Sequence, residues 1–90
     1  MNQQQLDPGY ELWQHKEGKD IVKVKFLRYY VLFQPVKTSV SDALFYIILV
    51  LTAADHTKFG WYKMRKSSFY NYFKPIPKLR KILLKEMLGI

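Results

Sequence analysis

The chain has 90 residues, of which 49% are hydrophobic and 17% aromatic, and its 15 Lys and Arg against 7 Asp and Glu give a net charge of +8. A chain of this length has interior for one domain, and its hydrophobic content is that of a folded chain rather than a disordered one. With no cysteine in the sequence, disulfides, zinc fingers and iron-sulfur clusters are excluded. The positive charge indicates an anionic partner: nucleic acid, an anionic membrane face or an acidic protein.

Residues 1–9 are polar and predict a flexible tail ahead of a single domain over residues 10–90. This tail lacks the basic stretch and apolar run of a secretory signal, so we expect a cytoplasmic protein. The longest apolar run, residues 43–54, is shorter than the roughly 20 residues of a membrane-spanning helix, and no membrane span is expected. His15 and His56 are far apart and lack the spacing of metal ligands, so we expect no metal and no other cofactor.

The first half of the domain has the pattern of a β-hairpin. Along residues 22–26, written VKVKF, apolar side chains alternate with two lysines, which predicts a strand with its valines in the core and its lysines in water. A turn around Gly18 precedes this strand, and we expect it to tolerate lengthening because loop entropy grows slowly. The aromatic segment 28–33 has no clear period, and Gln34 and Pro35 are expected to end it.

The middle of the chain predicts a central helix and a short strand. Ser39 is expected to cap the helix, with Asp42 complementing its positive end. Residues 43–54 are apolar nearly all round, as in a helix at the centre of a small domain. A short strand is then expected over residues 60–64.

The last third predicts two more helices. Ser67 and Ser68 can cap a short helix ending at Phe73, and the prolines beyond it predict a tight turn. A third helix over residues 77–88 ends at Gly89, with apolar and basic side chains on opposite sides. The inward stripes of the two long helices are expected to pack together through Leu44, Phe45, Ile48, Leu51, Leu79 and Leu83.

The runs ALFYIILVLTAAD, GWYKMRKSSFYNYF and KLRKILLKEMLGI resemble the winged helix-turn-helix domains of plasmid and phage replication initiators. The upstream KDIVKVKFLRYY is similar to the strand leading into those domains, so the resemblance covers residues 20–90. It implies an α+β fold of winged-helix type, with three helices, an N-terminal β-hairpin and a short strand. Two features depart from the family: Ile76 and Pro77 stand where a polar cap opens the recognition helix, and the chain ends at Ile90, where the C-terminal wing would begin.

The resemblance also implies that the second and third helices form the DNA-reading unit. Lysines on the third helix would meet phosphates or base edges, Arg80 could grip a guanine edge, and Asn71 could read adenine. The same lysines are also typical of the solvated face of an ordinary surface helix. The expected DNA-binding residues are Arg65, Lys66, Ser67, Ser68, Tyr70, Asn71, Lys74, Lys78, Arg80, Lys81 and Lys85.

The sequence therefore favours a non-enzymatic module that binds duplex DNA, with single-stranded DNA and a homodimer left open. No carboxylate is paired in sequence with a histidine or nucleophile, and the isolated glycines form no phosphate-cradling loop. The alternative is a small phage or virus-like protein-interaction module that binds and inhibits a host protein through its aromatic residues. A third hypothesis, attachment of segment 63–81 to an anionic membrane surface, is disfavoured by its two prolines.

Overall fold

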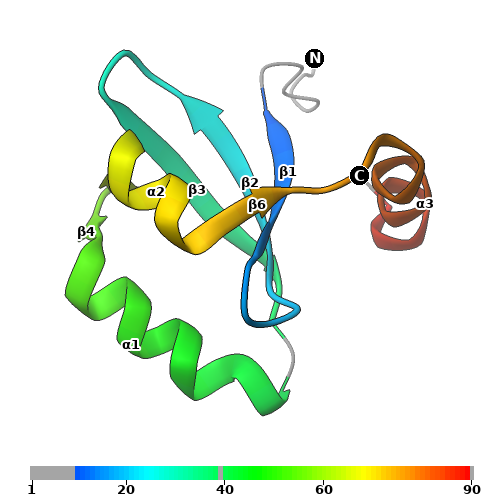
Figure 1. Cartoon of the computed structure of the whole chain (residues 1–90), viewed down its shortest axis with the longest axis horizontal. Coiled ribbons are helices and arrows are strands. Elements are labelled where there is room, and N and C mark those ends of the chain that lie inside the picture. Colours follow the sequence, from blue (N-terminus) through cyan, green and yellow to red (C-terminus); the bar gives the residue numbers. More distant parts are fainter. Residues whose placement is uncertain (1–9, 39, 90) are drawn as a thin grey trace.

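The computed structural model describes residues 10–38 and 40–89, so the predicted tail and the predicted Ser39 cap lie outside the described residues. These residues form three α-helices and six strands (Figure 1). The strands are β1 (Glu11–His15), β2 (Ile21–Phe26), β3 (Tyr30–Lys37), β4 (Asp55–His56), β5 (Tyr62–Arg65) and β6 (Phe73–Pro75). The helices are α1 (Ala43–Ala53), preceded by a 3-10 turn (Val40–Asp42), α2 (Lys66–Tyr72) and α3 (Lys78–Leu88).

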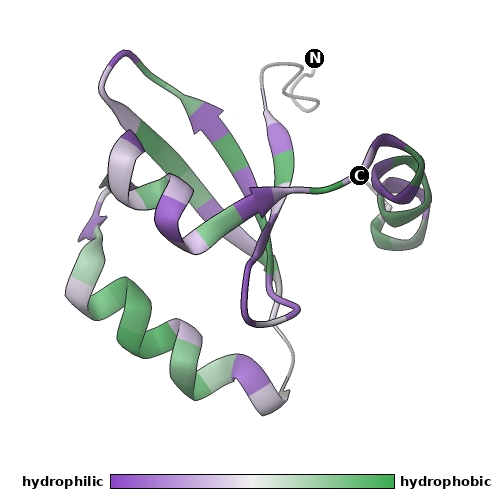
Figure 2. Cartoon of the chain, viewed as in Figure 1, coloured by the Kyte–Doolittle hydropathy of each residue, from purple (hydrophilic) through white to green (hydrophobic). Residues whose placement is uncertain are grey.

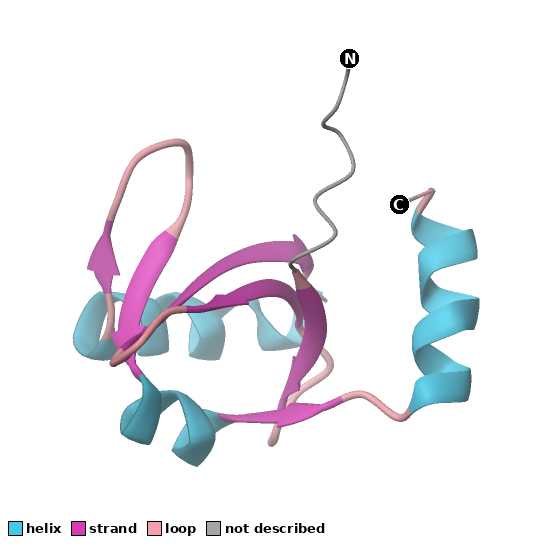
Figure 3. Ribbon diagram, turned by 90° about the horizontal axis from the view of Figure 1, so that it is seen from above, coloured by secondary structure: helices cyan, strands magenta, loops and turns pink. Residues whose placement is uncertain are grey.

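All six strands belong to one antiparallel sheet with the order β4-β5-β3-β2-β1-β6. The first three strands form a meander, and β6 returns to pair with β1, so that Phe73 lies opposite His15. The sheet is strongly curved, with α1 and α2 on one side of it and α3 beyond the β1–β6 edge (Figure 3). The predicted α+β class and the predicted N-terminal hairpin, formed by β1 and β2, are confirmed.

The main core fills the inner face of this curved sheet. The predicted alternation in β2 is confirmed, because Val22 and Val24 are fully buried while the lysines between and after them are only half-buried. Phe69 of α2 is also fully buried and stacks on Phe73 with ring centroids 4.7 Å apart. The side chains buried in this core are Trp13, Val22, Val24, Val31, Phe33, Tyr46, Leu49, Val50, Met64, Phe69 and Phe73. A smaller cluster of Leu12, Ile21 and Ile76 lies under α3 and contacts Leu84.

Helix α1 meets the core along one narrow side. Only Tyr46, Leu49 and Val50 of this helix are buried. Asp42 makes no side-chain cap bond at its N-terminus; its carboxylate instead accepts a hydrogen bond from the backbone N–H of Lys19 at 2.7 Å. Asp42 thus stands at the N-cap of α1, where its negative charge complements the helix end as predicted, but its carboxylate makes its hydrogen bond to the β1–β2 turn.

The predicted packing of α1 against α3 is wrong. Leu44, Leu51, Leu79 and Leu83 are between 60% and 79% exposed, and Phe45 and Ile48 are about half exposed. The physical reason is the position of the two helices, which lie on different sides of the molecule, α1 against the inner face and α3 beyond the β1–β6 edge (Figures 1 and 3). Strand β6 also occupies the segment where a tight turn between α2 and α3 was predicted, so these helices are separated by a sheet strand.

Helix α3 begins one residue later than predicted, with Pro77 as its N-cap, and ends where predicted, but the side expected to face the core faces solvent. It ends at Gly89, whose φ of 72° is the left-handed conformation that glycine adopts readily. Its side toward the sheet carries Leu84, Lys81 and Lys85, which are half-buried, and its predicted core face is turned to solvent.

The predicted turn around Gly18 is confirmed, and side-chain hydrogen bonds with Gln14 and Asp42 hold it in place, while its tolerance of lengthening stays a prediction. A Cβ on Gly18 would lie 3.0 Å from the Asp42 carboxyl carbon, and the Gly18 carbonyl accepts a hydrogen bond from Gln14. We expect Gly18→Ala to lower the free energy of unfolding by about 1 kcal/mol, because the Asp42 carboxylate must move and its bond to Lys19 weakens. Urea unfolding measures this, with the exposed Lys16→Ala as control. Equal stability of both variants would contradict a fixed turn.

Candidate nucleic-acid interface

The outer face of the sheet gathers basic and aromatic side chains. Antiparallel register places Lys25 opposite Leu32 and Leu32 opposite Lys63, so three neighbouring strands present these side chains on one face. Lys23 lies on the same face, two residues before Lys25 on β2. The inner face is filled by the core, so this outer side is where β2, β3 and β5 can meet a partner.

Each lysine of this face stands over an aromatic ring. The Lys25 ammonium lies 5.1 Å from the centroid of Trp61, and the Lys63 ammonium lies 5.0 Å from that of Tyr30. Such contacts hold the lysine ammonium near the face of an aromatic ring, while the aliphatic part of the lysine side chain covers apolar surface. Lys23 and Lys85 both stand over Tyr10, at 5.2 and 5.3 Å. We call the set Tyr10, Lys23, Lys25, Tyr30, Trp61, Lys63 and Lys85 the basic sheet face.

The predicted residues around α2 form a group beside this face. Arg65 and Ser67 are exposed and line a hollow of about 390 Å³ together with Tyr29 and Tyr30. Ser68 lines a neighbouring hollow of about 500 Å³ with Arg65 and Lys63, where Asp55 adds an acidic side chain. The expected serine caps are wrong, because α2 begins at Lys66 and its N-cap residue is Arg65, which makes no side-chain cap bond.

The other residues predicted around α2 are exposed to different degrees. Lys66 is half-buried, with its ammonium 5.9 Å from the Phe26 ring centroid. Tyr70 is 47% exposed and stacks on Phe26 at 6.3 Å, while Asn71 is exposed. Lys74 is exposed on β6, opposite Gln14 of β1.

The predicted residues on α3 do not form one outward basic face. Lys78 is exposed, but Lys81 and Lys85 are half-buried on the side of the helix that faces the sheet. The Arg80 guanidinium donates a hydrogen bond of 2.7 Å to the side-chain oxygen of Gln14. A guanine edge would have to compete with this bond, so the arrangement does not favour sequence reading by Arg80. Lys85 instead joins the basic sheet face through Tyr10.

Three residues of the candidate interface were interpreted from sequence as solvated or ordinary strand positions: Lys23, Lys25 and Lys63. Their alternation with buried residues showed that they lie on an outer face but not which strands are neighbours. The excess of aromatic residues was visible, whereas the pairing of each lysine with a ring depends on the register of β2, β3 and β5.

A polar site of different character lies under α1. Nε2 of His15 and the hydroxyl of Tyr46 are buried and have no hydrogen-bond partner within the described residues. Both residues border a hollow of about 190 Å³ that is also lined by Asp20 and Asp42. Burial raises the pKa of Tyr46, with the neighbouring Tyr62 and Asp20 adding to the rise, so this phenol stays protonated. Sequence reasoning missed Tyr46 because its helix is apolar on all sides.

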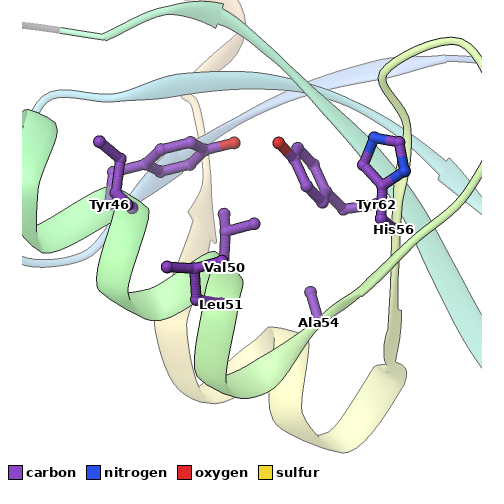
Figure 4. A pocket seen from close by; sticks show the side chains of 7 residues that line it. Tyr46, Val50, Leu51, Ala54, His56 and Tyr62 are labelled. Carbon is purple, nitrogen blue, oxygen red and sulfur yellow. The ribbon is translucent and has the colours of Figure 1, made fainter.

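The hydroxyls of Tyr46 and Tyr62 point toward one another across a second hollow (Figure 4). This hollow has a volume of about 250 Å³ and lies between α1 and the strands β4 and β5. Its lining is largely apolar and includes two residues of the exposed side of α1, Ile47 and Leu51.

His15 makes the stability of the fold depend on pH. Burial lowers the pKa of His15 below its ordinary value, and the nearby Asp20, Glu17 and Asp42 oppose this only in part. The unfolded chain therefore takes up the proton first, and stability is lost as the pH falls below about 6.5 toward the folded-state pKa. We expect His15→Gln to flatten the decline of the unfolding free energy between neutral and mildly acidic pH. His56→Gln, at an exposed position, is the control and should keep the wild-type slope; equal slopes for all three proteins would contradict this.

Within residues 10–38 and 40–89, no group of three or more His, Asp or Glu side chains is placed to hold a metal ion. None of the helices in the described part of the chain has the length and apolar character needed to cross a membrane.

The surface best suited to an anionic ligand is thus the basic sheet face, with the α2 group beside it. Comparison with protein-family models, curated proteins and solved structures finds nothing that matches the chain.

Proposed function

We propose that the protein is a nucleic-acid-binding module whose main contact surface is the basic sheet face. The observation that carries this proposal is the pairing of lysines with aromatic rings on neighbouring strands, with Lys23, Lys25 and Lys63 at its centre. Lysines neutralise phosphates, and aromatic side chains beside a basic groove stack on bases with little sequence preference. The net charge of +8 attracts such a ligand from a distance.

The side chains that the helices and the sheet present to solvent favour a single strand over duplex DNA. A helix that enters the major groove must present a polar outward side, whereas α3 turns Leu79, Leu83 and Met87 to solvent. A sheet face that carries lysines beside aromatic rings suits an extended strand whose bases are unpaired. Winged-helix docking on duplex DNA and a role in plasmid or phage replication remain predictions, and the duplex is the competing ligand in the test.

The test is a fluorescence anisotropy titration of the whole chain with labelled single-stranded and duplex DNA at several salt concentrations. We expect the single strand to bind more tightly, with the logarithm of affinity falling linearly with the logarithm of salt at about 0.7 per phosphate contacted. Tighter binding of duplex DNA would instead favour contact through the predicted DNA-reading helices, α2 and α3. Absence of salt-sensitive binding to either ligand would overturn a nucleic-acid function.

A protein-interaction module is the second candidate, favoured by the exposed apolar sides of α1 and α3. Contiguous apolar surface of this extent is uncommon on a monomer and marks interaction sites. The two candidates differ in their response to salt, because apolar contacts persist at salt concentrations that weaken phosphate contacts.

A further inference from the structure

The loop between β4 and β5 carries a phenylalanine in an unfavourable backbone conformation. Phe59 has a φ of 59°, and no other non-glycine residue within the described ranges 10–38 and 40–89 has a positive φ. This left-handed conformation crowds the Cβ of an L-residue, and a bulky side chain is exceptional there. Gly60, the next residue, adopts its own positive φ of 79° without that cost. The chain therefore places a phenylalanine where glycine or asparagine would be the ordinary residue.

Hydrogen bonds hold the loop in this conformation. The Gln34 side-chain amide donates a hydrogen bond of 2.9 Å to the Phe59 carbonyl. The backbone N–H and the hydroxyl of Thr57 both donate to the Trp61 carbonyl at 2.8 Å, and the Trp61 N–H donates to the Lys58 carbonyl at 3.2 Å. A strained residue persists only where its surroundings determine its conformation to this degree, and such residues cluster at sites that bind ligands.

The ring of Phe59 does not belong to the core. It is 88% exposed, more than any other large apolar side chain of the described residues, and neither hydrophobic cluster includes it. An exposed apolar side chain is ordinary by itself, but one that a strained and hydrogen-bonded backbone holds in solvent is not. Core packing therefore gives no reason for this residue, whereas a ligand that covers the ring would.

The loop that carries Phe59 borders the basic sheet face. Lys58 and Trp61 of the loop line a hollow of about 350 Å³, whose other wall includes Lys25 of β2 and Leu32 of β3. Polar and apolar residues alternate along β2 (Figure 2), and Lys25 belongs to the polar set on the outer face. Its ammonium lies over the Trp61 ring, as described above. Phe59, two residues before Trp61, thus adds a further ring to the rim of the basic sheet face.

We propose that Phe59 stacks on an unpaired base of the bound single strand, while the exposed Lys58 beside it contacts a neighbouring phosphate. This inference rests on the proposed function and adds to it the residue that receives a base. Every base has a flat π-face, so a stacking ring binds a single strand without selecting its sequence. Because the loop already holds the ring in solvent, binding requires little further ordering of the chain.

The test compares Phe59→Gly with the wild-type chain in anisotropy titrations of a labelled oligothymidylate at several salt concentrations. We expect the affinity to fall about 10-fold, the loss typical of one contact between a base and an aromatic ring. The slope of log affinity against log salt should stay the same, because no phosphate contact is lost, whereas Lys58→Gln should lower it by about 0.7. Phe59→Tyr, which keeps a ring, should bind like wild type. Phe45→Ala, which removes a half-exposed ring from α1, should do so as well.

The melting temperature gives a second readout, which is independent of the ligand. Glycine adopts the φ of Phe59 without crowding, and the ring that is lost is exposed, so Phe59→Gly should melt a few degrees above wild type. Stability and affinity then change in opposite directions, as expected where strain serves binding. A residue with only a structural role would lose stability when it is replaced.

The outcomes separate this inference from the proposed function. If wild type and Phe59→Gly bind the oligothymidylate equally well, the inference is overturned and the proposed function stands. A lower melting temperature of Phe59→Gly would also overturn the inference, since the ring would then stabilise the fold. If wild type binds no single strand, both fail. Binding of wild type but not of Phe59→Gly to vesicles of anionic phospholipid would in that case assign the ring to a membrane surface.

Discussion

Replacement of Phe69 by alanine is expected to lower the free energy of unfolding by about 3 to 5 kcal/mol. The Phe69 ring is fully buried between two rings of the sheet. Its centroid lies 5.1 Å from that of Trp13 on β1 and 4.7 Å from that of Phe73 on β6. Its removal leaves a cavity at the point where α2 closes the inner face. Since small domains have only about 5 to 15 kcal/mol of stability in total, a substantial fraction would unfold at physiological temperature. Urea denaturation at neutral pH measures the effect.

The matched control is Leu83→Ala, which removes a comparable apolar side chain from α3. Leu83 is 60% exposed, so we expect a change within about 0.5 kcal/mol in the isolated chain. From the sequence this substitution was expected to be among the most damaging, because Leu83 was placed in the core. A loss of several kcal/mol at Leu83, together with a small loss at Phe69, would show that α3 rather than α2 seals the core.

The local structure was largely predictable from the sequence because local signals determine it. A period of two along residues 22–26 is enough to identify β2 and its buried side. Gly89 and the prolines mark the ends of α3 equally clearly. Strand β3 was missed because Gln34 and Pro35 look like terminators. Pro35 is tolerated there because it pairs with Val22 where the register of β2 and β3 is irregular, and such irregularities are where sheets admit proline.

The arrangement of the helices was not predictable because their sequences do not specify which side is buried. Helix α1 is apolar on every side, so nothing distinguishes Tyr46 and Val50, which are buried, from Leu44 and Leu51, which are exposed. Helix α3 is amphipathic, but its larger apolar side faces solvent, and Leu84 alone contacts the small cluster beneath it. In both helices the apolar side was assigned to the core of the chain, whereas in the folded chain most of it is exposed.

From the sequence, the basic contact residues were predicted around α2 and on α3, whereas the interface proposed from the structure is centred on β2 and β5. The lysines on α3 were predicted to contact DNA because they share one side of a helix, which can be read from the sequence. Those on β2 and β5 come together only through the pairing of both strands with β3. Long-range register of this kind carries no signal in a single sequence, so the basic sheet face could be found only in the folded chain.

Substitution of Lys23, Lys25 and Lys63 by glutamine is expected to weaken binding of single-stranded DNA on the order of 100-fold at physiological salt. If each lysine contacts one phosphate, the slope of log affinity against log salt falls by about two units for a single strand. Glutamine keeps much of the aliphatic stem over the aromatic rings, so the fold should be retained. Anisotropy titrations at several salt concentrations give both the affinity and the slope.

The control is a second triple variant with the same loss of charge, in which Lys78, Lys81 and Lys85 of α3 are replaced by glutamine. Any effect of net charge alone is equal in the two variants, so the difference between them reports the location of the contact surface. We expect the α3 variant to lose less than one unit of slope, because only Lys85 belongs to the basic sheet face. If the α3 variant loses more affinity than the sheet variant, the phosphates lie along α3 and the basic sheet face is not the binding surface.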